Sequence, residues 1–178
     1  MNEEKILLPD FLIADLYKNS LVELVKQSTK TVNENKNQIV LRETLEAIKF
    51  LGDNGQRIII VVEHNNEIFL PENDLVFLTN VLKACALKLS DIAIVNIFEQ
   101  KASFVLLKEQ LSASKILLFA VKPSDLGLPF SIPDFQVHNY DGCSIMVSPA
   151  LAEMNDGTPK GKELKVQFWT SLKKMFGV

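Results

Sequence analysis

Glu63 and His64 are the titratable residues best placed for chemistry, because they directly follow the uninterrupted apolar run Ile58-Ile59-Ile60-Val61-Val62. Such a run is typical of a strand that is covered on both faces of a sheet. Ligands of open α/β sheets gather at the carboxyl ends of the strands, so these two side chains mark a candidate pocket. Glu67 would extend them to a metal-binding group, but the two intervening asparagines and a following proline favour a polar loop. We therefore expect no metal here.

Cys143 is a second candidate for chemistry, since it follows a glycine and has His138 a few residues upstream. Acyl transfer needs a nucleophile on a sharp turn, a base and an orienting carboxylate. The sequence has no Gly-x-Ser-x-Gly elbow. The other cysteine, Cys85, lies in an apolar helical stretch where a buried thiol is ordinary. We expect structural roles for both cysteines and no catalytic residue.

Nucleotide-binding loops are missing from the places where they would occur. A loop that cradles phosphate needs closely spaced glycines between a buried strand and a helix. Neither the segment after Val62 nor the segment after Val95 contains a glycine before the next element. We therefore expect no nucleotide and no other cofactor.

The overall charge argues against a protein that coats nucleic acid. The 178 residues include 19 basic and 22 acidic ones, which leaves a formal net charge of −3, whereas DNA-coating proteins are usually strongly basic. Direct contact with nucleic acid stays an open question. The sequence has no apolar run long enough to span a membrane, and its first residues lack the pattern of a signal peptide. These features predict a cytoplasmic protein with no membrane partner.

Buried strands alternate with amphipathic helices from Arg57 onward. The apolar runs 58–62, 92–95 and 116–121 predict strands, and apolar residues at helical spacing between them predict helices. This alternation predicts a three-layer α/β/α fold with a mainly parallel sheet of about four or five strands.

Two turn signals define the C-terminal part of this fold. Asp141-Gly142 stands between the short strand-like runs 135–140 and 143–147 and predicts an antiparallel hairpin at one edge of the sheet. Thr158 as N-cap, with Pro159 in the first turn, predicts the start of a long last helix.

The N-terminal part is predicted to be a helical extension of the α/β domain. Apolar residues in 13–24 recur at three- and four-residue spacing and predict an amphipathic helix. Residues 26–38 alternate asparagine with charged residues and predict a polar connector. A second helix is predicted over 42–51. The predicted organisation is therefore an extension, residues 1–38, followed by a single α/β domain, residues 39–178.

The predicted N-terminal helix carries apolar residues beyond its own stripe. Two interpretations are open: the helix packs on its own domain, or it docks in the groove of a partner protein, which a polar connector would permit. The residues that would bind the partner are Leu8, Phe11, Leu12, Leu16 and Tyr17.

The predicted last helix is rich in lysine and contains one acid, Glu163. One interpretation is a solvated face, in which lysines near the helix end also suit its dipole. The other is a binding surface for an acidic partner or a phosphate backbone. The basic residues are Lys160, Lys162, Lys165, Lys173 and Lys174.

The C-terminal third resembles a known family. The segment Gly142-Cys143-Ser144-Ile145-Met146-Val147-Ser148-Pro149-Ala150-Leu151, followed by Lys162-Glu163-Leu164 and Phe168-Trp169, resembles the psi subunit of bacterial DNA polymerase III holoenzyme. The similarity extends upstream to about Arg57, whereas residues 1–56 match no motif of the family. The resemblance implies a small non-catalytic α/β protein whose N-terminal segment joins the clamp-loader collar and whose domain binds a chi partner. We therefore expect protein partners, either clamp-loader subunits or a chi-like protein.

An enzymatic alternative comes from uracil-DNA glycosylases, compact α/β proteins with a Ser-Pro element late in the chain, similar to Ser148-Pro149. Their first strand leads into a Gly-x-Asp/Glu-Pro loop that holds a water-orienting acid, but Glu63 lacks that glycine and proline. Base flipping also needs an aromatic floor and a reader of the base edge, which the sequence does not reveal. The sequence favours a non-catalytic adaptor, with a degenerate glycosylase-like enzyme near Glu63 and His64 as the alternative.

Overall fold

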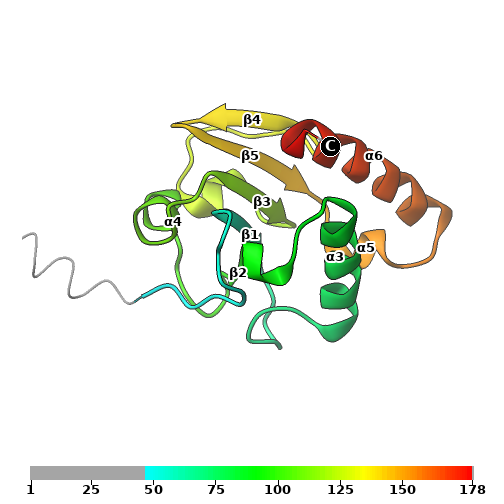
Figure 1. Cartoon of the computed structure of the whole chain (residues 1–178), viewed down its shortest axis with the longest axis horizontal. Coiled ribbons are helices and arrows are strands. Elements are labelled where there is room, and N and C mark those ends of the chain that lie inside the picture. Colours follow the sequence, from blue (N-terminus) through cyan, green and yellow to red (C-terminus); the bar gives the residue numbers. More distant parts are fainter. Residues whose placement is uncertain (1–46, 178) are drawn as a thin grey trace, which may run out of the picture. The chain divides into compact units, whose positions relative to one another are not determined.

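A five-stranded sheet lies at the centre of the computed structural model, which describes residues 47–177 (Figure 1). The strand order is β2-β1-β3-β5-β4. The first four strands in this order are parallel, and β4 pairs antiparallel with β5. The predicted mainly parallel sheet with one antiparallel edge is confirmed. The strands are β1 (Ile58–Val62), β2 (Ile92–Asn96), β3 (Lys115–Phe119), β4 (Val137–Tyr140) and β5 (Cys143–Ser148).

Helices cover both faces of this sheet, which confirms the predicted three-layer α/β/α fold (Figure 1). α3 (Glu72–Ala84) connects β1 to β2, and α4 (Phe104–Leu111) connects β2 to β3. α4 packs on one face. α3 packs on the other face together with α5 (Leu151–Met154) and α6 (Pro159–Phe176).

The apolar run of β1 feeds two separate cores. Ile59 and Val61 pack with Leu107 of α4 on one face of the sheet. Ile58 and Ile60 pack with Phe168 of α6 on the other face. Successive side chains of a strand point to opposite faces, so a central strand with a helical layer on each side must be apolar at every position.

The predicted helix over residues 42–51 is wrong in the part that the structure describes. Residues 47–50 are not helical, and Leu51 pairs with Ile94 through two hydrogen bonds, of 2.9 Å from its own N–H and 2.8 Å to its own carbonyl. β2 is the edge strand of the sheet, so its free backbone groups bind this segment instead. Ile48 is buried in the core beside α4.

The hairpin and the start of the last helix are confirmed. β4 and β5 flank Asp141-Gly142, with Tyr140 opposite Cys143. α6 begins at Pro159, and the Thr158 hydroxyl accepts a hydrogen bond of 3.0 Å from the Gly161 N–H. The N-cap satisfies one of the amide groups that the first turn leaves without a helical partner.

One compact unit of the chain begins at Ala47. The predicted extension over residues 1–38 lies outside the described residues, and so do Leu8, Phe11, Leu12, Leu16 and Tyr17. Within residues 47–177, no helix combines the length and the apolar character needed to cross a membrane.

Candidate functional site

Glu63 and His64 lie in the loop that follows β1, at the carboxyl end of the sheet as predicted. Asn96, the last residue of β2, holds this loop in place and is 1% exposed. Its amide donates to the carbonyls of His64 and Glu67 at 2.7 and 2.9 Å. Its oxygen accepts from the N–H groups of His64 and Phe98 at 3.0 and 3.1 Å. The side-chain amide of Asn96 therefore binds backbone atoms, which is a structural role.

The side chains on this loop expose apolar surface as well as charge. Ile68 of this loop and Phe98, which follows β2, are exposed apolar residues. Asn96 donates to the carbonyl of Glu67, next to Ile68, and accepts from the N–H of Phe98 itself. Glu63 is exposed and His64 is half-buried. The loop therefore presents a firmly held outer surface with apolar side chains.

Asp74 is the titratable residue that sequence reasoning missed at this end of the sheet. It lies in the first turn of α3 and is 5% exposed. Burial raises the pKa of its carboxyl, and the nearby His64 acts in the opposite direction. A carboxylate beside an imidazole can orient a general base. The polar position inside an otherwise apolar helix pattern was the available signal.

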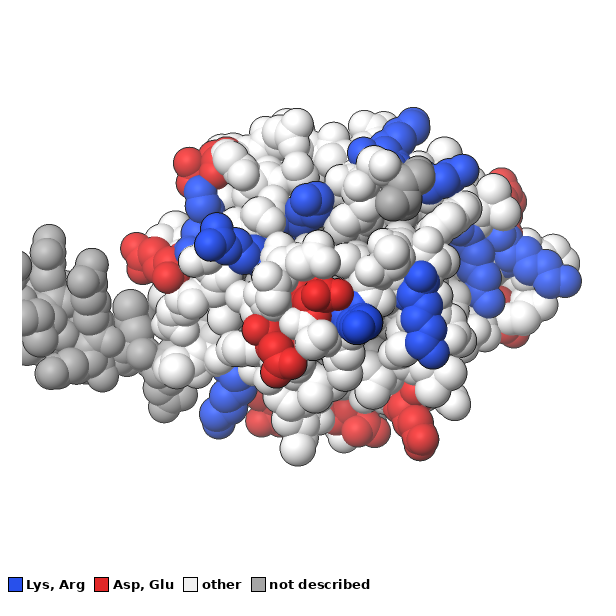
Figure 2. All heavy atoms as spheres, viewed as in Figure 1, with Lys and Arg blue, Asp and Glu red and all other residues white. Residues whose placement is uncertain are grey.

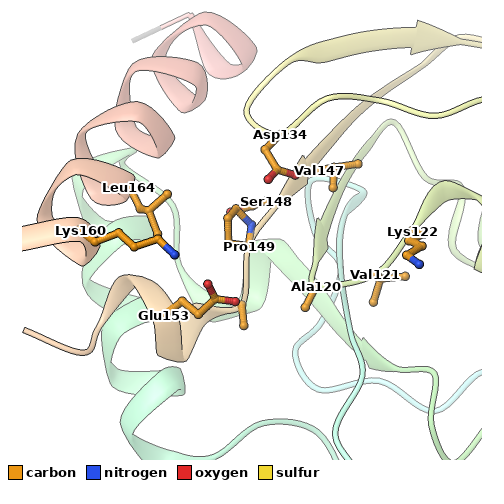
Figure 3. A pocket seen from close by; sticks show the side chains of 11 residues that line it. Ala120, Val121, Lys122, Asp134, Val147, Ser148, Pro149, Glu153, Lys160 and Leu164 are labelled. Atoms are coloured by element: carbon orange, nitrogen blue, oxygen red, sulfur yellow. The ribbon is translucent and has the colours of Figure 1, made fainter. Parts of the chain in front are cut away.

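A pocket of about 420 Å³ lies at the carboxyl ends of β3 and β5. In Figure 3 the side chains of Lys160 and Glu153 reach toward the space beside Ser148 and Pro149. Neither Glu63 nor His64 lines this pocket, so the structure does not unite them with the Ser-Pro turn. The pocket also contains no imidazole, because the described histidines are elsewhere.

Cys143 and His138 do not form a catalytic pair. Burial raises the pKa of the Cys143 thiol to about 11, so little thiolate exists at neutral pH. His138 packs against Phe130 at 4.8 Å between ring centroids. Cys85 is also buried, and burial raises its thiol pKa. The predicted burial of Cys85 is confirmed.

An apolar groove of about 280 Å³ lies between α3 and α6; we call it the α3–α6 groove. Among its lining residues only Asn80 and Lys165 are polar. The Lys165 ammonium lies 4.9 Å from the centroid of the Phe77 ring, so its aliphatic stem borders the apolar floor. The remaining lining residues are Val81, Ala84, Phe168 and Trp169. These residues lie on two helices that are far apart in the sequence, and no local pattern predicts that they line one groove.

No protein-family model matches the chain, and no curated protein matches it. Among the described residues 47–177, no three His, Cys, Asp or Glu side chains form a group that could hold a metal ion. The surfaces described above are therefore the basis for inferring a function.

Proposed function

We propose that this protein is a non-catalytic adaptor that joins other proteins in an assembly. The observation that carries this proposal is the α3–α6 groove, an accessible apolar hollow that includes Phe77 and Trp169. Apolar hollows bordered by polar residues favour contact with another protein, because closing them removes apolar surface from water.

In its specific form, the proposal is a psi-like accessory subunit of a DNA polymerase III clamp-loader assembly in the cytoplasm. It is supported by the similarity in sequence around the turn Ser148-Pro149-Ala150-Leu151, which joins β5 to α5. In this mechanism the α/β domain contacts one protein and residues 1–38 contact another. Two linked contacts raise the effective concentration of each partner without tight individual binding.

The test is affinity purification of the tagged full-length protein from its native cell, followed by mass spectrometry of the proteins that copurify. We expect clamp-loader subunits or a chi-like protein. Their reproducible absence, in a lysate shown to contain the intact clamp loader, would overturn the psi-like proposal.

The enzymatic alternative is favoured by one observation: the half-buried His64 is near enough to the buried Asp74 to influence its carboxyl electrostatically. Its test is incubation of the full chain with a single-stranded oligonucleotide that contains one uracil. An adaptor releases no uracil. Uracil release that His64→Ala abolishes, at an unchanged melting temperature, would establish an enzyme instead.

A further inference from the structure

We infer that the α3–α6 groove binds an amphipathic helix of a partner protein, and that acidic side chains flank the apolar face of that helix. This inference rests on the proposed adaptor function and specifies the chemistry of one partner.

The apolar floor of the groove is the reason to expect an apolar face on the partner helix. Val81 and Ala84 of α3 lie opposite Phe168 and Trp169 of α6. Grooves between two helices commonly receive a third helix, whose apolar residues at i, i+3, i+4 and i+7 enter as a ridge.

Exposed valines extend the apolar surface beyond the floor on both helices. Val76 is 55% exposed and precedes the lining residue Asn80 by one turn of α3. Val166 is 66% exposed and precedes Trp169 by three residues on α6. Residues at this spacing are neighbours on a helix surface, so each valine lies beside one lining residue, on the outer side of its helix. The apolar surface is therefore longer than the hollow alone.

Lysines around the groove are the reason to expect acidic side chains on the partner helix. Lys165 lines the groove itself. Lys162 and Lys173 are exposed and stand seven residues before and four residues after Trp169, which places them along the same side of α6. Lys83 lies in the last turn of α3. Lys and Arg side chains gather over the part of the molecule where α6 lies (Figure 2).

Few acids compensate this charge on the two helices. α6 contains one, Glu163. α3 contains Glu72 and Asp74 in its first turn, and Asp74 is buried. A helix with glutamates or aspartates beside its apolar ridge therefore complements the groove in charge as well as in shape.

A single-stranded nucleic acid could bind the lysines through its phosphates, but the floor of the groove is poorly suited to its bases. Stacking of successive bases needs exposed aromatic faces. The groove has three aromatic side chains, and none of them offers a free face: Phe168 is buried, Trp169 is half-buried, and the half-buried Phe77 ring lies beneath the Lys165 ammonium. The observations therefore favour a protein helix, and an oligonucleotide becomes a competitor in the test.

The experiment is a titration of the full chain with designed peptides, followed by tryptophan fluorescence. Trp169 is the only tryptophan in the 178 residues, so the signal reports the groove directly. The probe is a peptide without tryptophan that carries leucines at i, i+3, i+4 and i+7 and glutamates beside them. The matched peptide replaces each glutamate by lysine. We expect saturable binding of the glutamate peptide, weakened by salt, and binding of the lysine peptide weaker by about tenfold.

Two variants locate the binding site. Val166→Asp puts a carboxylate beside the groove, and we expect the affinity for the glutamate peptide to fall by about tenfold. Lys165→Glu reverses the charge in the groove and should lower the affinity for the glutamate peptide further. The matched control for the first variant is Val105→Asp, since Val105 is 59% exposed on α4, which packs on the opposite face of the sheet. The control should bind like the unmodified chain.

The inference is overturned if the lysine peptide binds as tightly as the glutamate peptide, or if Val166→Asp leaves binding unchanged. It is also overturned if a thymidine oligonucleotide binds at Trp169 more tightly than the glutamate peptide. The adaptor proposal fails separately. If clamp-loader subunits copurify equally with the unmodified chain and with Val166→Asp, the adaptor stands and the groove is not its docking site. If the peptide binds but no such subunit copurifies, the groove is a helix-binding site and the psi-like adaptor proposal fails.

Discussion

Asn96 is the polar side chain on which the loop after β1 depends. Its four hydrogen bonds connect the end of β2 to backbone atoms of residues 64, 67 and 98. Asn96 itself is buried, so removal of its amide would take these four bonds from the loop at once. The candidate residues Glu63 and His64 are therefore positioned by a residue of the neighbouring strand.

Replacement of Asn96 by alanine should lower the free energy of unfolding by about 2–4 kcal/mol, because all four hydrogen bonds of this buried side chain are lost together. The measurement is urea denaturation of both proteins. Asn139→Ala is the control, since the exposed Asn139 accepts one hydrogen bond, from Ser144. It should cost about 0.5 kcal/mol or less. Equal losses for both variants would contradict the structural role of Asn96.

Asp74 should make stability depend on pH with a definite sign. Burial raises its pKa in the folded chain above the value of 3.8 for an unperturbed carboxyl. The folded state then holds the proton to higher pH than the unfolded state, so stability falls as pH rises through that window, and the loss persists at pH 7. Asp74→Asn should therefore melt at a higher temperature than the unmodified chain at neutral pH.

The advantage of Asp74→Asn should shrink as the pH falls from the raised pKa of folded Asp74 toward 3.8, and it should be absent below that, where Asp74 is protonated in both states. Asp156 is the control of opposite sign. The Thr158 N–H donates to the Asp156 carboxylate and lowers its pKa, so Asp156→Asn should destabilise the chain at neutral pH. A neutral or destabilising effect of Asp74→Asn at pH 7 would show that burial does not control this carboxyl.

At the scale of elements, the segment before β1 closes the edge of the sheet. Leu51 pairs with Ile94 of β2, and the chain then turns toward β1 through Gly52, whose φ is +106°. A Cβ at this position would collide with the Ile92 carbonyl oxygen. The close backbone approach is what allows the segment to cover β2, because any side chain at position 52 would hold the two backbones apart.

Gly52→Ala should therefore cost about 3 kcal/mol or more, since it combines an unfavourable φ with a backbone collision. Gly127→Ala is the matched control. Gly127 also has a positive φ, of +76°, but a Cβ there would meet nothing within 4 Å. It should cost about 1–2 kcal/mol, from φ alone. Thermal or urea denaturation measures both, and equal costs would contradict the collision.

At the scale of the whole molecule, the described domain has a core on each face of its sheet, and helices of residues 47–177 contribute to both cores. One compact unit of the chain runs from Ala47 to its end. A unit with its own core on each face of a sheet should not need the N-terminal extension in order to fold.

A chain of residues 39–178 should unfold in one cooperative transition with a midpoint near that of the full chain. It should also lose one of the two partners of the proposed adaptor. Calorimetry or urea denaturation tests the first point, and affinity purification tests the second. Loss of cooperative unfolding would show that residues 1–38 belong to the core, and the division into extension and domain would then be wrong.

The layers of the fold and its sheet could be predicted from the sequence alone. The run from Ile58 to Val62 is apolar at every position because both of its faces are covered, and this pattern is visible without coordinates. Asp141-Gly142 and Thr158-Pro159 are local signals as well, and the hairpin and the last helix follow them. Periodicity and turn chemistry act over a few residues, so a single segment contains them in full.

The contacts between segments far apart in the sequence could not be predicted in this way. Residues 47–51 belong to a predicted helix, but Leu51 pairs with Ile94 of β2, because an edge strand offers hydrogen bonds that helix propensity does not include. Asn96 binds a loop about thirty residues away, and Phe77 meets Lys165 across two helices. The α3–α6 groove exists because the two helices pack side by side on one face of the sheet. Such contacts depend on relative placement in space, which no local pattern contains.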